Sequence, residues 1–296
     1  MLAIAKWLNA KAALRFCGLR PMMRLEEYAP NKTIRRGNAM KIMVINQAPL
    51  TAKSKPNYDI EKITHQLNSY ASPGTTIELG FPDNFAGAAL KDAIGSQDAL
   101  NGLHHILEAP SIIAKIFWAA ENGYDAVVSS NTFDPGVDGA RLAVHIPVIG
   151  PLRATMHVAL TLADRVGITV PLKTHVPYTR RILRAYGLEQ FVTDIVPIDI
   201  YRGVQERKEE IFDKTATLIR SMMERGAEII LPLGGALIPY VVNPDDLARE
   251  TGIQVLNTKA CSIAMAEMCV RFGMTQSNLT YPKAKLKIAD FNEGFK

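Results

Sequence analysis

The fold is decided by residues 123–136, which read Gly-Tyr-Asp-Ala-Val-Val-Ser-Ser-Asn-Thr-Phe-Asp-Pro-Gly. After a glycine that ends a helix, the first half is a short apolar run rich in β-branched residues, which predicts a buried parallel strand. The second half is a polar loop in which Asp-Pro-Gly turns the chain into the next helix. Because open α/β sheets bind ligands beyond the carboxyl ends of their strands, we expect the functional site at this loop.

The same succession of strand, polar loop and helix recurs along the chain from Met40 onward. Further strands are predicted at residues 42–45, 75–79, 148–149, 166–170, 192–197, 229–233 and 255–256. Helices are predicted at residues 57–70, 111–122, 154–162, 179–186, 206–225 and 262–272. Such alternation is typical of parallel sheets with helices on their faces.

Two segments repeat at a nearly constant shift. Residues 123–129, Gly-Tyr-Asp-Ala-Val-Val-Ser, match residues 226–232, Gly-Ala-Glu-Ile-Ile-Leu-Pro, and residues 145–150 match residues 252–257. The predicted fold class is therefore α/β, with two pseudo-symmetric lobes that are each a four-stranded parallel sheet flanked by helices. We expect residues 40–150 plus 258–285 in the first lobe and residues 151–257 in the second. The loops after Ser130 and Leu233 then face each other across a cleft.

The net charge of +5 belongs to the beginning of the chain. Residues 1–39 hold eight basic residues against Glu26 and Glu27, so the rest is nearly neutral and no nucleic-acid partner is expected. No apolar segment has the length of a membrane span, so no membrane partner is expected either. The three cysteines, Cys17, Cys261 and Cys269, lack metal-ligand spacing and indicate reduced thiols in a cytoplasmic protein.

Residues 1–39 are a basic N-terminal extension that we expect to be poorly packed. The extension is similar to an arginine-rich targeting peptide over its first part. It could also form a basic amphipathic helix on a surface. In the third interpretation it results from an upstream start codon, and folding begins at Met40.

A family resemblance rests on the Asp-Pro-Gly loop followed by Ile146-Pro-Val-Ile-Gly150. This combination resembles the aspartate/glutamate/hydantoin racemase superfamily, with the hydantoin racemase branch nearest, over about residues 40–285. The resemblance implies a cofactor-independent enzyme in which two cysteines, one from each half, exchange a proton at the substrate Cα. The matching positions here are Asn131 and Gly235, so a relay of two thiols is not available. Arylmalonate decarboxylases also lack one thiol, but they keep the second, which is missing here.

The candidate binding residues lie in the two strand-end loops and after the first strand. Their backbone N–H groups at helix N-termini suit a carboxylate or a developing oxyanion, although ordinary turn and cap roles are the alternative. The candidates are Asn46, Ser130, Asn131, Thr132, Phe133, Gly234, Gly235 and Ala236. No metal ion and no cofactor is expected.

A replacement base must come from another part of the chain. His175 follows a strand and titrates near neutral pH, and a solvated loop residue is the alternative. Asp134 could orient His175 or activate water, or it could simply form the turn. His104 and His105 are predicted in a polar connection, as a lid or as structural residues. We expect His157 to pack on a helix and Cys261 and Cys269 to lie in the core.

Three functions follow from this site. The first is isomerisation or decarboxylation of a small carboxylate, amino acid or cyclic amide through an enolate-type intermediate. The second is hydrolysis of a cyclic amide or ester, with His175 or Asp134 activating water. The third is ligand binding without catalysis. An enzyme is favoured because the loops are polar and glycine-rich. The expected partners are a small-molecule substrate and, on family analogy, further copies of the chain in a homo-oligomer.

Overall fold

The structure, a computed structural model, describes residues 39–47, 49, 59–83 and 102–285. These residues belong to one compact unit that spans Thr33–Lys296. Among them, none of the helices combines the length and the apolar character that a membrane span requires. The predicted basic extension is residues 1–39, of which residues 1–38 lie outside the described residues.

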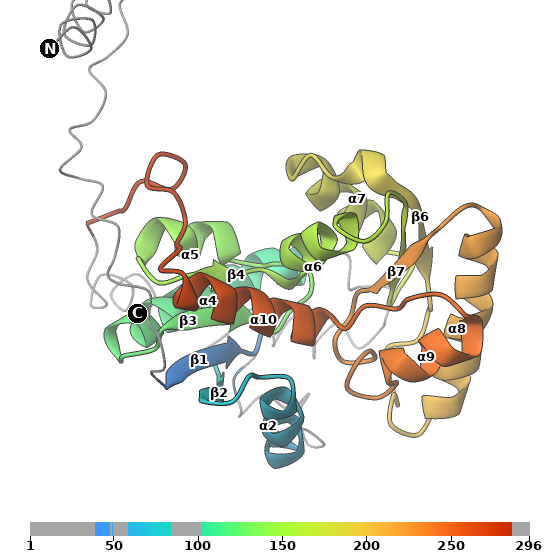
Figure 1. The fold of residues 1–296 in the computed structure, drawn as a ribbon, viewed down its shortest axis with the longest axis horizontal. Coiled ribbons are helices and arrows are strands. Elements are labelled where there is room, and N and C mark those ends of the chain that lie inside the picture. The colour runs from blue at the N-terminus through green and yellow to red at the C-terminus, as the bar shows by residue number, and fades with distance from the viewer. Residues whose placement is uncertain (1–38, 48, 50–58, 84–101, 286–296) are drawn as a thin grey trace, which may run out of the picture. The chain divides into compact units, whose positions relative to one another are not determined.

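The first sheet consists of four parallel strands in the order β2-β1-β3-β4 (Figure 1). Both faces of this sheet are covered by helices, which explains why its strands are apolar without alternation. The strands are β1 (Met40–Ile45), β2 (Thr75–Gly80), β3 (Ala126–Ser129) and β4 (Val148–Ile149).

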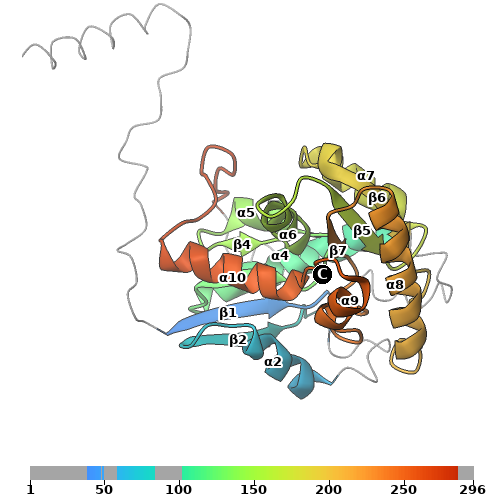
Figure 2. The same cartoon turned by 45° about the vertical axis from the view of Figure 1, so that its right-hand side comes forward.

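Successive residues of β1 pack into different layers of the core. Met43 and Ile45 point to the face covered by α4 (Leu103–Glu121) and α5 (Val137–Ala143). Ile42 and Val44 point to the face covered by α2 (Ile60–Ser69) and α10 (Thr258–Arg271). In Figures 1 and 2, α10 lies beside α6 over the first sheet, although it comes from the end of the chain.

The second sheet repeats the order of the first with β6-β5-β7, again parallel. Its strands are β5 (Val166–Val170), β6 (Val192–Pro197) and β7 (Ile229–Pro232). The fourth predicted strand, residues 255–256, is reduced to a bridge between Val255 and Ile230. Gly252 and Asn257, the caps of two successive helices, leave too few residues between them for a longer strand. The α/β fold class is confirmed, with sheets of four and three strands.

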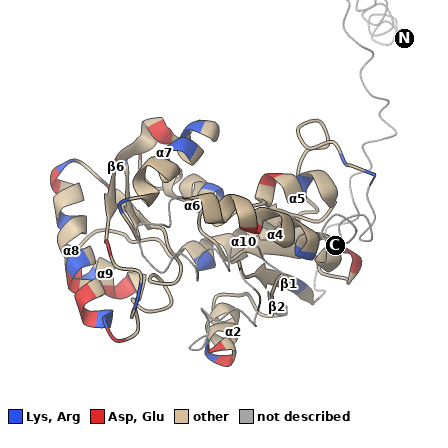
Figure 3. Ribbon diagram, turned by 180° about the vertical axis from the view of Figure 1, so that it is seen from behind, with Lys and Arg blue, Asp and Glu red and all other residues tan. Residues whose placement is uncertain are grey.

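The second sheet also has helices on both faces. These are α6 (Pro151–Leu160) and α7 (His175–Ala185) on one face, and α8 (Lys208–Glu224) and α9 (Pro244–Thr251) on the other. A 3-10 turn, η4 (Glu189–Phe191), follows α7. Figure 3 shows acidic and basic residues together on α8 and α9, as expected for solvated helix faces. The assignment of residues 40–150 plus 258–285 to one lobe and residues 151–257 to the other stays a prediction.

The predicted start of the α4 helix was wrong. The sequence predicts a polar, glycine-containing loop before residue 111, but α4 begins at Leu103 and continues through Pro110. Buried residues on both sides of the proline, from His104 and Glu108 to Ile112 and Ile116, hold the helix in place despite the lost backbone hydrogen bond. His104 and His105 therefore lie in the first turn of a helix and not in a polar connection.

Candidate functional site

The loops that follow β3 and β7 meet, as the sequence predicts. The Gly234 N–H donates a hydrogen bond to the Thr132 hydroxyl over 2.7 Å. Gly234 has a φ of +90°, and a Cβ at this position would lie 2.2 Å from Pro171 Cγ, so only glycine allows this approach. The carboxyl ends of the two sheets are thus joined at one place.

Lys259 lies where these two loops meet, and the sequence analysis missed it. Its side chain is completely buried, and its Nζ donates to the Ser130 carbonyl and lies 3.4 Å from Ser130 Oγ. A Cβ on Gly235 would lie 3.0 Å from Lys259 Cε and 3.2 Å from Nζ. The amine therefore occupies the space that a side chain at position 235 would need.

The first turn of α10 holds Lys259 in this position. The Asn257 side chain caps the helix by accepting hydrogen bonds from the N–H groups of Lys259 and Ala260, at 3.0 and 3.1 Å. Burial lowers the pKa of Lys259 to about 7, while the negative charge of Asp134 acts in the opposite direction. Neutral amine and ammonium are then both populated near neutral pH, as proton transfer requires.

Asn131 is fixed by a buried polar network on the other side of the same loop. Its Oδ1 accepts from the Phe133 N–H at 3.0 Å, and its Nδ2 donates to Gln47 Oε1 at 2.8 Å and to Glu108 Oε1 at 3.0 Å. The same Glu108 oxygen lies 2.5 Å from His105 Nδ1. Because both amide hydrogens of Asn131 have acceptors, His105 Nδ1 is the donor to Glu108.

His175 lies beside this network and is not a solvated loop residue. It is the first residue of α7 and only 1% exposed. One imidazole nitrogen from each of His104, His105 and His175 lies within 4.8 Å of the other two. The ring of Phe133 lies 4.9 Å from those of both His105 and His175, measured between centroids. The sequence predicts His175 on the ligand side of the sheet, but it does not predict that His104 and His105 lie beside it.

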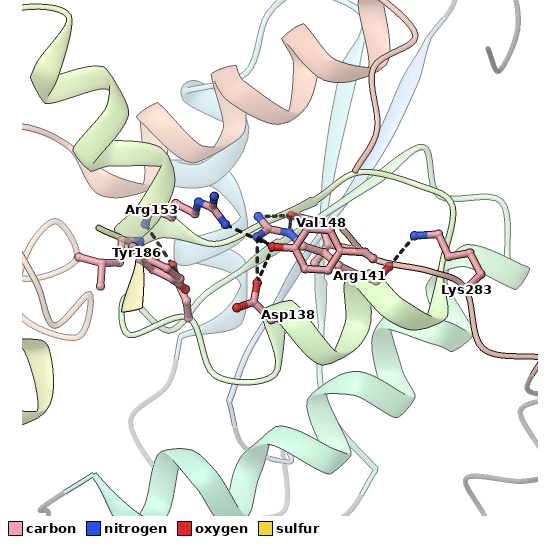
Figure 4. Close-up of polar contacts among 9 residues, drawn as sticks. Asp138, Arg141, Val148, Arg153, Tyr186 and Lys283 are labelled. Atoms are coloured by element: carbon pink, nitrogen blue, oxygen red, sulfur yellow. Dashed lines mark hydrogen bonds and ion pairs between the residues drawn. The ribbon is translucent and has the colours of Figure 1, made fainter. Parts of the chain in front are cut away.

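Asp134 binds the N-terminus of α6. Its carboxylate accepts hydrogen bonds from the N–H groups of Leu152 and Arg153, at 2.9 and 3.0 Å, and from the Tyr186 hydroxyl at 3.2 Å. In Figure 4, Arg153 and Tyr186 lie together, and the guanidinium is 5.2 Å from the ring centroid. Burial raises the pKa of Asp134 to about 6, although the α6 hydrogen bonds act against it. This geometry supports a capping role, and a part in water activation stays a prediction.

Several predicted binding groups are already used within the protein. The Ser130 N–H donates to the Ile45 carbonyl at 2.7 Å, and the N–H groups of Phe133 and Gly234 donate to Asn131 and Thr132. These three N–H groups therefore have acceptors within the protein, and ligand binding by the loop residues stays a prediction. Asn46 is buried beside the loop, whereas Ala236 is exposed and does not bring a side chain to the site.

The remaining candidates lie outside this centre. His157 is on α6 as expected, but it is exposed and does not pack in the core. Cys261 and Cys269 are half-buried, and burial raises the pKa of both thiols. Neither thiol is therefore activated as a nucleophile or a base.

The missed residues had weak signals in the sequence. Lys259 stands in the run Thr-Lys-Ala-Cys-Ser-Ile-Ala-Met, in which every other residue is small or apolar, so a helix there would bury its lysine. His105 and Glu108 are spaced to meet on one helix face, but only if the helix extends through Pro110. Neither signal predicts which residues the buried side chains contact in the folded protein.

Comparisons with known proteins agree with the arrangement of the two sheets. The sequence profile described as Asp/Glu/Hydantoin racemase matches residues 60–266, more than half of the chain. Hydantoin racemase from Rhizobium meliloti is 28% identical over 193 residues, 64% of this chain and 78% of that protein. Hydantoin racemase from Pseudomonas sp. (strain NS671) is 27% identical over 251 residues, which are 83% of this chain and 93% of that protein. The solved structure of allantoin racemase from Klebsiella pneumoniae has the same fold, with a TM-score of 0.69 and 24% identity. The match covers 84% of this chain and 95% of that one.

The titration of Asp134 should make stability depend on pH. Its pKa is raised from 3.8 to about 6 in the folded protein, so folding retains a proton that the unfolded chain releases. The stabilising contribution is complete below pH 4 and is lost as the pH rises through 6. Urea unfolding should show that the free energy of unfolding of wild type, minus that of Asp134→Asn, falls by about 3 kcal/mol between pH 4 and 7.

The same change at the more exposed Asp138, on the neighbouring helix α5, controls for the loss of one negative charge. If the difference for Asp134 rises with pH, the hydrogen bonds from α6 outweigh burial and the assigned direction is incorrect.

Proposed function

The chain belongs to the Asp/Glu/hydantoin racemase family and is an enzyme of the racemase/isomerase superfamily, and we propose that it transfers a proton at a carbon beside a carbonyl group, with Lys259 as the base. The proposed substrate is a small cyclic amide or carboxylate. Two relatives are named hydantoin racemase and a third allantoin racemase, and both words denote ring amides with a stereocentre beside a carbonyl. That chemistry supports a cyclic amide as the first substrate class to test.

The proposal rests on the position of the Lys259 amine beside Gly235. The family resemblance puts the second proton-transferring thiol at position 235, and here the lysine nitrogen lies about where that side chain would begin. A pKa of about 7 gives the amine the two properties of a good base, since it is partly neutral at physiological pH and its conjugate acid can return the proton. The hydrogen bond to the Ser130 carbonyl fixes the direction of its lone pair.

The negative charge that develops on the substrate needs nearby donors. In the described part of the chain, the N–H groups of Gly235 and Ala236 form no hydrogen bond within the turn, whereas Leu237 and Ile238 donate to Gly234. We assign Gly235 and Ala236 to the substrate carbonyl as it becomes an enolate-type oxyanion. The reaction moves only a proton, so it needs no organic cofactor. The assembly of the chain into a homo-oligomer stays a prediction.

Replacing Lys259 should abolish the exchange of the substrate hydrogen with solvent. In D₂O, wild type is expected to exchange the hydrogen at the stereocentre of an optically pure 5-substituted hydantoin or of allantoin, as seen by NMR and chiral chromatography. Lys259→Met should reduce the rate by about 10²–10⁴-fold, the usual contribution of one acid–base group. Lys283→Met is the matched control, because Lys283 is half-buried and burial also lowers its pKa, but its amine donates to the Arg141 carbonyl (Figure 4).

The pH profile tests the same assignment. Since the neutral amine is the base, kcat/KM should rise about tenfold per pH unit below 7 and level off above it. Full exchange by a folded Lys259→Met variant would exclude the lysine as the base. Incorporation of ¹⁸O from labelled water into a ring-opened product would instead show hydrolysis.

Binding of the proposed substrate class can be measured separately from turnover. A substrate that binds the folded protein alone raises its stability, by about 2.7 kcal/mol at a hundred times Kd. We expect 5-substituted hydantoins to raise the Tm of wild type and of Lys259→Met, since the ring is held by backbone groups. A shift with open-chain amino acids and none with hydantoins would move the substrate class to amino acids.

A further inference from the structure

Three imidazoles from two separate helices meet in the interior. His104 and His105 come from the first turn of α4, and His175 is the first residue of α7. All three are buried, and one nitrogen from each ring lies within 4.8 Å of the other two. Ring centroids are 3.8 Å apart for His104 and His105, and 6.0 Å from each of these to His175.

This spacing is close to that of a three-histidine metal site. Zinc–nitrogen bonds of about 2.0–2.1 Å at tetrahedral angles place two ligand nitrogens about 3.3 Å apart. Small rotations of the three rings bring nitrogens that already lie within 4.8 Å to that separation. Imidazole is a preferred ligand of Zn²⁺, Cu²⁺, Ni²⁺ and Fe²⁺, whereas Mg²⁺ and Ca²⁺ prefer oxygen.

The groups behind the rings also suit a metal. His105 Nδ1 lies 2.5 Å from Glu108 Oε1, and a proton donated there leaves the lone pair of the ring on Nε2, where it can bind a metal. A carboxylate in this position orients a ligating histidine and increases its basicity. Glu108 is itself held by Asn131, and as a buried anion it balances part of the charge of a cation. Phe133 and Tyr178, with ring centroids 4.9 and 5.2 Å from that of His105, limit the access of water.

We propose that His104, His105 and His175 bind a divalent first-row transition metal, with Zn²⁺ as the representative ion and Glu108 as the residue that orients His105. Three protein ligands leave the fourth tetrahedral position for water or a substrate oxygen. The assignment makes His175 a ligand instead of the base predicted from the sequence. It also revises the expectation from the sequence that no metal ion is bound.

The metal site lies close to the proposed base without sharing residues with it. Lys259 contacts Ser130, and the network of Glu108 and His105 contacts the next residue, Asn131. A substrate carbonyl at the open position would be polarised by the cation, which makes the adjacent hydrogen more acidic. Metal binding does not depend on the proposed reaction and is measured without a substrate.

The test uses the full chain without an affinity tag, stripped with a chelator and titrated with ZnCl₂ by calorimetry. We expect one Zn²⁺ per chain, a rise in Tm with Zn²⁺ but not with Mg²⁺, and visible absorption of a tetrahedral site with Co²⁺. Glu108→Gln should weaken binding by about 10–100-fold, and His175→Gln should abolish the Co²⁺ spectrum. His145→Gln, an exposed histidine away from the cluster, should bind as wild type.

Absence of stoichiometric binding by wild type would overturn the proposal, and so would full affinity in a folded Glu108→Gln protein. Loss of Zn²⁺ binding in Cys261→Ser together with retained binding in His175→Gln would also overturn the proposal. If His175→Gln fails to fold, Glu108→Gln decides, because the amide keeps the size of the side chain. Lys259→Met should bind Zn²⁺ normally, so a failure of the metal site and a failure of the proposed proton transfer remain distinguishable.

Discussion

The hydrogen bond between the Gly234 N–H and the Thr132 hydroxyl ties together the two loops on which the site is built. Each loop leaves the carboxyl end of a central strand, β3 or β7, and each would otherwise end in solvent. Their contact is possible because Gly234 lacks the Cβ that would strike Pro171. Once the loops are joined, Lys259 and Asn131 are enclosed, and the polar chemistry of the site takes place away from bulk water.

Enclosure has an energetic cost that the rest of the structure offsets. Buried ionisable groups are unfavourable unless they are neutral or hydrogen-bonded. Asp134 accepts hydrogen bonds from two backbone N–H groups of α6 and from a tyrosine hydroxyl. Glu108 accepts hydrogen bonds from Asn131 and His105. Lys259 has a carbonyl acceptor, and its lowered pKa reduces the fraction that is charged. Such a concentration of perturbed groups is common at functional sites and rare in a core that only supports folding.

The sequence predicts the scaffold of this site better than its contents. The strand at 123–129, the turns at Gly136 and Gly234 and the meeting of two loops follow from local pattern and internal repetition. Lys259 and the pair His104 and His105 do not, because their roles depend on residues far away in the chain, Ser130 for Lys259 and His175 for the two histidines. The start of α4 is not predictable from local sequence either, because burial on both sides of Pro110 overrides the tendency of proline to interrupt a helix. The internal acceptors of the Ser130, Phe133 and Gly234 N–H groups are likewise not predictable from local sequence, because they lie on other strands, loops or turns.

The internal repeat explains how one framework supports an asymmetric site. Gly150 and Asn257 match in the repeat, so Leu152 and Lys259, two residues later, are at equivalent positions in the first turns of α6 and α10. Leu152 is buried in the core of the second sheet, and its N–H is capped by Asp134 from the β3 loop. At α10 the cap is the local Asn257, so the loop after β7 has no capping side chain to supply and can end in Gly235. The space beside that glycine is what allows a long basic side chain to replace a leucine without displacing the backbone.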